Sequence, residues 1–271
     1  MRSSILTLVF LLIVNVGYAA DNNISPPSSY PEGKLGALVK LGEDLINNTN
    51  VHELTKEYVG NDLTCTSCHL EAGKTSNKYS TFIGTASAFP AYSPREKAVI
   101  TLEERILNCF MRSMNGIRPP TGSKASIAIT TYITWLSEGY KIKMNTIKPV
   151  SINNSPFPLM RLKAILSKAD LINGKKLYKK KCSECHGANG QGGDNGPPVW
   201  GERSYNMGAG LSNNLKLASW LIFNMPIEEL GLSDKDAVDV ATYINSNPRP
   251  GFVLKSHLPS VDKLGVYNTN Q

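Results

Sequence analysis

The strongest constraint on the fold of this chain is a five-residue pattern that occurs twice, 117 positions apart. The copies are Cys65-Thr66-Ser67-Cys68-His69 and Cys182-Ser183-Glu184-Cys185-His186. Cys-x-x-Cys-His is the attachment signal of c-type haem, in which two thiols form thioethers to one porphyrin. The adjacent histidine then binds the iron as its proximal ligand. A zinc site would require more widely spaced ligands. The sequence therefore predicts two covalent haem c groups, attached through Cys65, Cys68, Cys182 and Cys185, with His69 and His186 as proximal ligands.

The N-terminal segment has the pattern of an export signal. Arg2 precedes an almost wholly apolar run from Ile5 to Val16, and small residues follow near Ala19 and Ala20. We therefore predict a signal peptide over residues 1–20. The alternative, an uncleaved anchor, has an apolar run shorter than the roughly 20 residues of a membrane span. We expect a periplasmic protein with no stable membrane insertion after cleavage.

Each haem motif is predicted to lie between helices. Apolar periodicity and capping residues indicate helices over 33–47 and 123–137 around the first motif, and over 170–181 and 233–246 around the second. No strand-like alternation of useful length is present. This arrangement resembles the class I cytochrome c fold, so we expect an all-α protein with two such domains. The expected boundaries are 21–145 for the first domain, a Pro-rich and Asn-rich linker over 146–160, and 161–271 for the second.

The second half offers two methionines as the distal ligand of its haem. Met225 stands before Pro226, 43 residues after Cys182, in the Met-Pro pattern common in cytochromes c. Met207 lies only 25 residues after Cys182, which is a short span for a chain that must pass around a haem. We expect Met225 to be the ligand. Either methionine could instead simply fill the core.

The same offset in the first half falls on the fifth cysteine. Cys109 lies 44 residues after Cys65, with Met111 and Met114 nearby as rivals. A buried spare thiol is the alternative, since free cysteines are often buried. The matching offsets and an oxidising compartment favour Cys109 as the distal ligand. A thiolate ligand would lower the reduction potential of this haem relative to a methionine ligand.

Cationic and polar residues surround Cys109 in the sequence. Thr101 and Glu104 form a capping box that predicts a helix start, and Arg105 then shares a helix face with Cys109. Ser113 lies on the same face if the helix continues, and Arg95 precedes this segment. Guanidinium groups match the geometry of small oxyanions, so we expect an oxyanion site here. Binding of haem propionates is the alternative role for the arginines.

At this point the sequence resembles a particular family, the thiosulfate dehydrogenases, which are dihaem cytochromes also active as tetrathionate reductases. The resembling segments are Leu63-Thr64-Cys65-Thr66-Ser67-Cys68-His69, Phe89-Pro90-Ala91-Tyr92-Ser93-Pro94-Arg95, Cys109-Phe110-Met111-Arg112-Ser113-Met114-Asn115-Gly116, Ser204-Tyr205-Asn206 and Asn224-Met225-Pro226. The resemblance implies oxidation of two thiosulfates to tetrathionate. It also implies His/Cys ligation at the first haem and His/Met ligation at the second, because Asn224 stands where some members carry a lysine that can ligate.

These observations give one functional hypothesis and two competitors. In the hypothesis, Arg95, Arg105 and Ser113 hold thiosulfate while Cys109 is both ligand and nucleophile. Electrons leave through the second haem to an acceptor such as another cytochrome c, with the physiological direction left open. The competitors are a non-catalytic electron carrier and a Sox-type sulfur-oxidation subunit, whereas a dihaem peroxidase is disfavoured because it would need an open or His-ligated peroxidatic haem, for which four histidines are few. The net charge of +7 suits anionic substrates and acidic protein partners. We expect no nucleic-acid partner.

Two smaller expectations concern the remaining histidines and the ring of His186. His52 and His257 have no companions at ligand spacing, so we expect both at the surface. The carbonyl of Pro197 or Pro198 is expected to fix the His186 ring, because haem-ligating histidines commonly donate their other ring N–H to such an acceptor.

Overall fold

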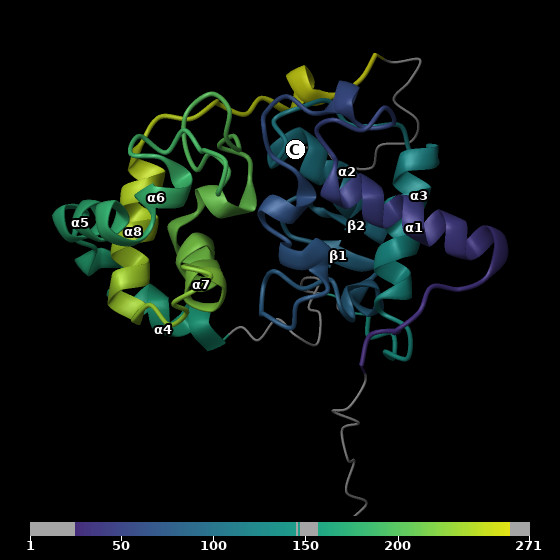
Figure 1. Ribbon diagram of the computed structural model, residues 1–271, viewed down its shortest axis with the longest axis horizontal. Helices are drawn as coiled ribbons and strands as arrows, with labels where there is room; N and C mark the ends of the chain where they lie inside the picture. The colour runs from purple at the N-terminus through teal and green to yellow at the C-terminus, as the bar shows by residue number, and fades with distance from the viewer. Residues whose placement is uncertain (1–24, 145, 147–156, 261–271) are drawn as a thin grey trace, which may run out of the picture.

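The computed structural model describes residues 25–144, 146 and 157–260. The expected signal peptide and most of the expected linker lie outside these residues. The described chain forms two mostly helical halves that stand side by side (Figure 1). Within the described residues, no helix is both long enough and apolar enough to cross a membrane.

In its described residues the first half contains three α-helices: α1 (Gly33–Asn47), α2 (Leu102–Arg112) and α3 (Lys124–Trp135). The predicted capping box starts α2, since the Thr101 side chain accepts from the Glu104 N–H and the Glu104 side chain accepts from the Thr101 N–H. α1 packs against α3. The two backbones meet at Gly42, where an added Cβ would lie 2.2 Å from the carbonyl oxygen of Ala128. Only glycine therefore fits at this crossing.

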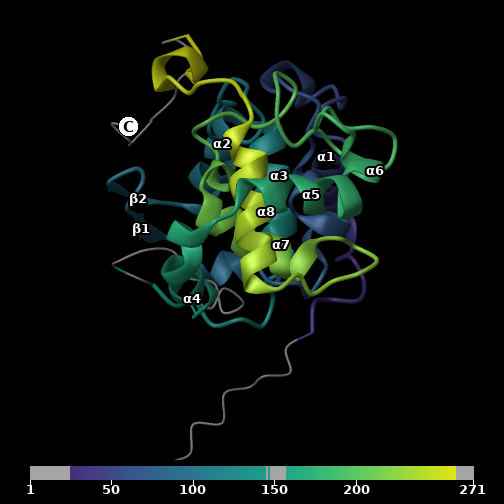
Figure 2. The same ribbon diagram turned by 90° about the vertical axis from the view of Figure 1, so that its left-hand side faces the viewer.

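Between residues 157 and 260 the second half contains five α-helices: α4 (Phe157–Ile165), α5 (Leu171–Lys181), α6 (Ser183–His186), α7 (Asn214–Asn224) and α8 (Asp234–Ser246). Asp170 and Ser233 cap the starts of α5 and α8, as their positions in the sequence predicted. α5 packs against α8, again through a glycine, because a Cβ on Gly174 would lie 2.2 Å from the Asp239 carbonyl oxygen. In Figure 2, which looks onto this half, α5 and α7 lie beside α8.

Short 3-10 helices connect these elements. They span Lys56–Tyr58, Cys65–Ser67, Leu70–Gly73, Thr85–Ala88, Leu166–Lys168, Gly210–Ser212 and Leu254–His257. The first haem motif thus begins in a 3-10 turn, whereas the second is folded into α6.

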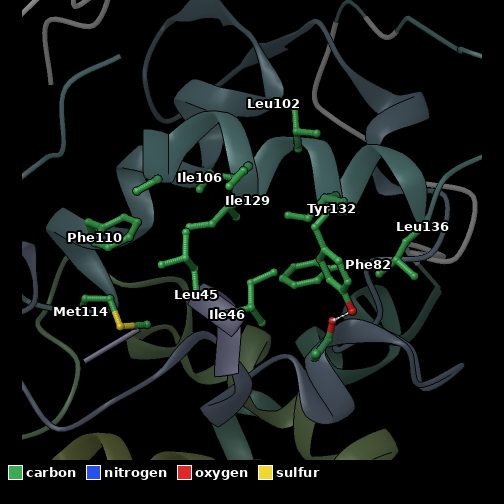
Figure 3. Packing of buried hydrophobic residues seen from close by; sticks show 14 of the residues in the cluster. Leu45, Ile46, Phe82, Leu102, Ile106, Phe110, Met114, Ile129, Tyr132 and Leu136 are labelled. Atoms are coloured by element: carbon green, nitrogen blue, oxygen red, sulfur yellow. Dashed lines mark hydrogen bonds between the residues drawn. The ribbon is translucent and has the colours of Figure 1, made fainter. Parts of the chain in front are cut away.

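The first half has a continuous apolar core (Figure 3). α1 contributes Leu45 and Ile46, and α3 contributes Ile129 and Tyr132. The Tyr132 hydroxyl donates to the Ala72 carbonyl at 3.0 Å, which satisfies its polar end inside the core. This bond also fixes the loop that follows the first haem motif.

Two features of the architecture depart from the sequence-based expectations. An antiparallel hairpin of β1 (Ala91–Ser93) and β2 (Ala98–Ile100) lies among the helices of the described residues. Strands of three residues are too short to show an alternating pattern. In addition, α4 begins at Phe157, inside the range expected to be linker, and packs on α7 and α8.

The end of the described chain returns from the second half to the first. In Figure 1 it runs from α8 across the top of the molecule. His257 donates from its ring Nδ1 to the Gly116 carbonyl at 2.7 Å, and its own carbonyl accepts from the Arg118 N–H. The expectation of a surface His257 is therefore wrong, because its side chain is buried against the first half. His52 is partly buried, with Nδ1 accepting from the Leu54 N–H.

Candidate functional site

Hydrogen bonds within its own loop fix the conformation of the first haem motif. The Thr64 hydroxyl and Ser67 form a capping box around the 3-10 turn that carries Cys65. The His69 ring donates from Nδ1 to the Ser80 carbonyl at 2.9 Å and stacks on Phe82 at 4.1 Å between ring centroids. Since Nδ1 is committed to the backbone, Nε2 is the ring nitrogen left to bind a metal.

The charge state of His69 also suits a metal ligand. Burial lowers its pKa to about 4, the Ser80 bond opposes that effect, and the nearby Arg105 charge lowers the pKa further. The ring is therefore neutral at pH 7, which is the form that coordinates iron. With two thiols beside it at attachment spacing, the segment fits a covalently bound haem c.

Cys109 lies on α2 with its thiol toward the first haem motif. Arg105, one helical turn earlier, donates from Nη1 to the Cys109 sulfur at 2.8 Å. The Cys109 charge raises the pKa of Arg105, and burial opposes this more weakly. Burial, together with the Cys109 charge, raises the pKa of both motif thiols, Cys65 and Cys68, to about 12. The fold thus places Cys109 near enough for its charge to act on both thiols of the first motif.

Arg95 joins this cluster from the hairpin. Burial lowers its pKa, as do the charges of Arg105 and Arg112, while Glu96 and Cys109 act in the opposite direction. The Arg95 guanidinium also reaches the second half, where its Nη2 would lie 3.9 Å from a Cβ on Gly210. The two arginines expected to bind an oxyanion therefore lie on different elements and converge near one thiol.

Sequence reasoning missed a buried carboxylate behind these arginines. Glu96 is 4 % exposed, lies 3.7 Å from the Arg112 guanidinium and accepts from the Asn108 amide at 3.1 Å. The hairpin turn places Glu96 next to Arg95 and against α2. A carboxylate this deeply buried requires cationic neighbours. In the sequence, the only local sign of this carboxylate is that Glu96 directly follows Arg95.

Ser113 and the two rival methionines occupy different positions. Ser113 ends α2 as its C-cap, and its carbonyl accepts from the Asn61 side chain at 2.9 Å. Met111 is completely buried, and Met114 lies in the core of the first half (Figure 3). Cys109 by contrast is only partly buried. The structure places Cys109 and Arg105 in contact and records no side-chain bond from Ser113 to them within the described residues.

The second haem motif repeats the histidine geometry of the first. The His186 ring donates from Nδ1 to the Pro197 carbonyl at 2.8 Å, one of the two acceptors expected from the sequence. Burial lowers the pKa of His186, and the bond to Pro197 opposes this. The Tyr178 hydroxyl on α5 donates to the Gly187 carbonyl at 2.8 Å and so fixes the chain after the motif. A neutral ring with Nε2 available again fits a haem c.

The two candidate methionines of the second half differ in their surroundings. Met225 is the C-cap of α7 and packs, partly buried, on the same apolar cluster as Cys182. Met207 is 55 % exposed. A distal ligand has to lie within the haem pocket, so these positions favour Met225.

The two halves share a polar and aromatic interface next to the first motif. The indole N–H of Trp220 on α7 donates to the Cys68 carbonyl at 3.1 Å. Tyr205 from the second half lies within the core of the first, with Arg249 stacked 4.2 Å from its ring centroid. Burial raises the pKa of Tyr205 to about 12, so its hydroxyl stays protonated at neutral pH.

Comparisons with known protein families match both halves. Residues 54–142 match the family described as SoxA/TsdA, cytochrome c domain. Residues 169–244 match the family described as cytochrome C oxidase, cbb3-type, subunit III. The match boundaries place one cytochrome domain around each Cys-x-x-Cys-His motif.

Curated relatives match across both halves. Thiosulfate dehydrogenase of Thiomonas intermedia is 36 % identical over 87 % of this chain and 73 % of its own length. The thiosulfate dehydrogenase of Allochromatium vinosum is 34 % identical over 82 % of each protein. Among solved structures, the thiosulfate dehydrogenase (TsdBA) from Marichromatium purpuratum matches with a TM-score of 0.70 at 34 % identity. That match covers 84 % of this chain and only half of the solved chain.

The two attachment motifs, the two neutral histidines and the matches over most of the chain agree with one another. The chain carries two covalently attached haem c groups, one in each cytochrome c domain. It belongs to the thiosulfate dehydrogenase family of dihaem c-type cytochromes.

Proposed function

We propose that this protein is a periplasmic thiosulfate dehydrogenase, which joins two thiosulfates into tetrathionate and releases two electrons. The observation that carries the proposal is the contact between the Arg105 guanidinium and the Cys109 sulfur at 2.8 Å beside the first haem motif. An electron carrier has no need of a nucleophile paired with a cation at this place. The names of the curated relatives support the same reaction.

The proposed ligands follow the geometry of each half. Cys65, Cys68 and His69 would hold the first haem together with Cys109. Cys182, Cys185, His186 and Met225 would do the same for the second haem. When bound, the two haems supply the electron acceptors of the reaction, one electron each.

Arg105 and Arg95 bind the substrate in this proposal. Thiosulfate is a dianion, and guanidinium forks match its oxyanion end bidentately. The arginines sit on different elements, α2 and the hairpin turn, so together they fix the direction of the S–S bond. Glu96 limits the excess positive charge between Arg95 and Arg112, and Ser113 is a further polar contact at the end of α2.

Cys109 performs the covalent chemistry. Its thiolate bonds to the sulfane sulfur of the first thiosulfate, which gives a Cys109–S–S–SO3⁻ adduct and releases two electrons. The second thiosulfate then attacks the sulfane sulfur of this adduct, breaks the bond to Cys109, and leaves as tetrathionate. The thiolate is regenerated, and no proton is taken up or lost. Arg105 stabilises the Cys109 thiolate both as it reacts and as it leaves.

A paired assay on the purified holoprotein tests the function. Thiosulfate with ferricyanide reports the oxidation, and tetrathionate with a reduced viologen reports the reverse reaction. Activity in either direction supports the proposal. Silence in both assays, with both haems present by spectrum, overturns it in favour of the electron carrier. A requirement for a separate sulfur-carrier protein would point to a Sox-type subunit.

A further inference from the structure

The last turn of α7 in the second half bonds directly to the segment around the first haem motif. Trp220 Nε1 donates to the Cys68 carbonyl at 3.1 Å, and Asn224 Nδ2 donates to the Lys78 carbonyl at 3.0 Å. Both side chains are buried, with Trp220 7 % and Asn224 0 % exposed. The two bonds therefore connect buried side chains of α7 directly to backbone carbonyls of the first half.

The segment that Asn224 contacts is the one that orients His69. Ser80, two residues after Lys78, provides the carbonyl that accepts from His69 Nδ1. The Ser80 hydroxyl also donates to the Cys68 carbonyl at 3.1 Å and accepts from the Leu70 N–H at 2.7 Å. Trp220 and Ser80 therefore converge on one carbonyl oxygen, that of Cys68, immediately before the histidine.

The same turn of α7 positions Met225. Asn224 is the last residue of the helix, and the Met225 N–H closes it by donating to the Leu221 carbonyl at 3.0 Å. Phe223 directly precedes Asn224 in α7, and its ring centroid lies 5.8 Å from that of Tyr79. One helical turn thus carries a contact to the His69 segment and, one residue later, the methionine of the other half.

We propose that Trp220 and Asn224 are positioning residues that couple the proximal His69 of the first haem to the Met225 segment of the second. Through them, a change at Met225 alters the His69–Ser80 hydrogen bond. That bond increases the basicity of the imidazole as a ligand and so favours the ferric state. Loosening it raises the reduction potential of the first haem, which is the haem beside Cys109. This inference rests on the ligand set of the proposed function.

The test uses two variants, Trp220→Phe and Asn224→Leu, in the holoprotein. The first keeps an aromatic ring and removes the N–H, and the second keeps the approximate volume and removes the amide. The readouts are the potential of the first haem by spectroelectrochemical titration and its low-spin EPR g values. We expect both variants to raise that potential and shift those g values. Combining each with Met225→Ala measures the coupling, because contacts that transmit it make the two effects non-additive.

Trp200→Phe is the matched control. Trp200 belongs to the same apolar cluster as Trp220, but its ring contacts are Tyr178 and Tyr243 within the second half. It removes the same volume without touching the His69 segment, so the first haem should keep its wild-type potential. The inference fails if Trp220→Phe and Asn224→Leu both leave the first haem unchanged, or if Trp200→Phe moves it equally.

The outcome is separable from that of the proposed function. The potential and EPR signals are measured without substrate, so a protein inactive toward thiosulfate can still show the coupling. Conversely, if the enzyme is active but neither variant changes the potential or g values of its first haem, the proposed reaction stands and only this inference is contradicted.

Discussion

The two halves hold their histidines in the same way and differ at the residue proposed as the opposite ligand. In each, a ring Nδ1 donates to a backbone carbonyl eleven residues later, Ser80 for His69 and Pro197 for His186. Cys109 then lies inside a helix with Arg105 one turn away, whereas Met225 follows the end of a helix. Domains of the same type therefore place a thiol paired with a guanidinium in the first half and a methionine at a helix end in the second.

Removing the thiol should erase this difference and give the largest effect. We expect Cys109→Gly to keep both covalent haems and lose thiosulfate oxidation by on the order of a thousandfold or more, as when other covalent nucleophiles are removed. Steady-state kinetics with ferricyanide measures the loss, and haem staining on a denaturing gel confirms attachment. Full activity in this variant would remove Cys109 from the reaction.

Arg105 should come next. Replacing it by Leu removes a donor to the thiolate and a substrate cation, so kcat/KM should fall about a hundredfold. Arg105→Lys keeps the charge and loses the planar guanidinium, so its kcat/KM should lie between that of Arg105→Leu and that of the wild type. Arg203→Leu is the control, since its guanidinium pairs with Asp62 at the surface with 60 % of the side chain exposed. Equal losses in the Arg105 and Arg203 variants would contradict a specific role.

The methionines test the second half. Met225→Ala should abolish the optical signature of methionine-ligated ferric haem and lower the potential of the second haem, because methionine ligation raises it. Turnover should drop about tenfold, within the cost of altering a metal's surroundings. Met207→Ala should change neither property. If the Met207 variant lost the signature instead, the ligand assignment would be reversed.

Substitutions at the glycines of the two helix crossings should give the smallest effects, and these should be similar in the two halves. Gly42→Ala and Gly174→Ala each force a methyl group against a backbone carbonyl, which costs roughly 1–3 kcal/mol of unfolding free energy. Denaturant unfolding of the holoprotein measures it. Gly251→Ala is the control, as a Cβ there meets nothing within 4 Å. A large loss of unfolding free energy for only one of the two variants would show that the two helix crossings are not equally tight.

The parts of this molecule that sequence could predict are those set by nearby residues. The starts of α2, α5 and α8 follow from Thr101, Asp170 and Ser233, because a capping side chain bonds to an N–H two or three residues away. The proximity of Arg105 to Cys109 follows from helical spacing. The sequence likewise limits the carbonyl that accepts from the His186 ring to two candidates, Pro197 and Pro198.

The remainder depends on contacts distant in sequence. Glu96 reaches Arg112 only because the hairpin folds back on α2, and three-residue strands leave no periodic signal. Trp220 and Cys68 are 152 residues apart, so nothing local marks their bond. His257 was expected at the surface for the same reason, since its acceptor, Gly116, lies 141 residues earlier. The ligand roles of Cys109 and Met225 stay predictions.

The contact of His257 with the first half bears on how the protein is assembled. Domains are made in order from the N-terminus, and each generally folds as a unit. Here the first domain keeps an uncovered edge at Gly116 and Arg118 until residues of the second are available to cover it. The domain proposed to hold the reactive thiol is thus complete only when residues of the second domain, proposed to accept its electrons, are in place.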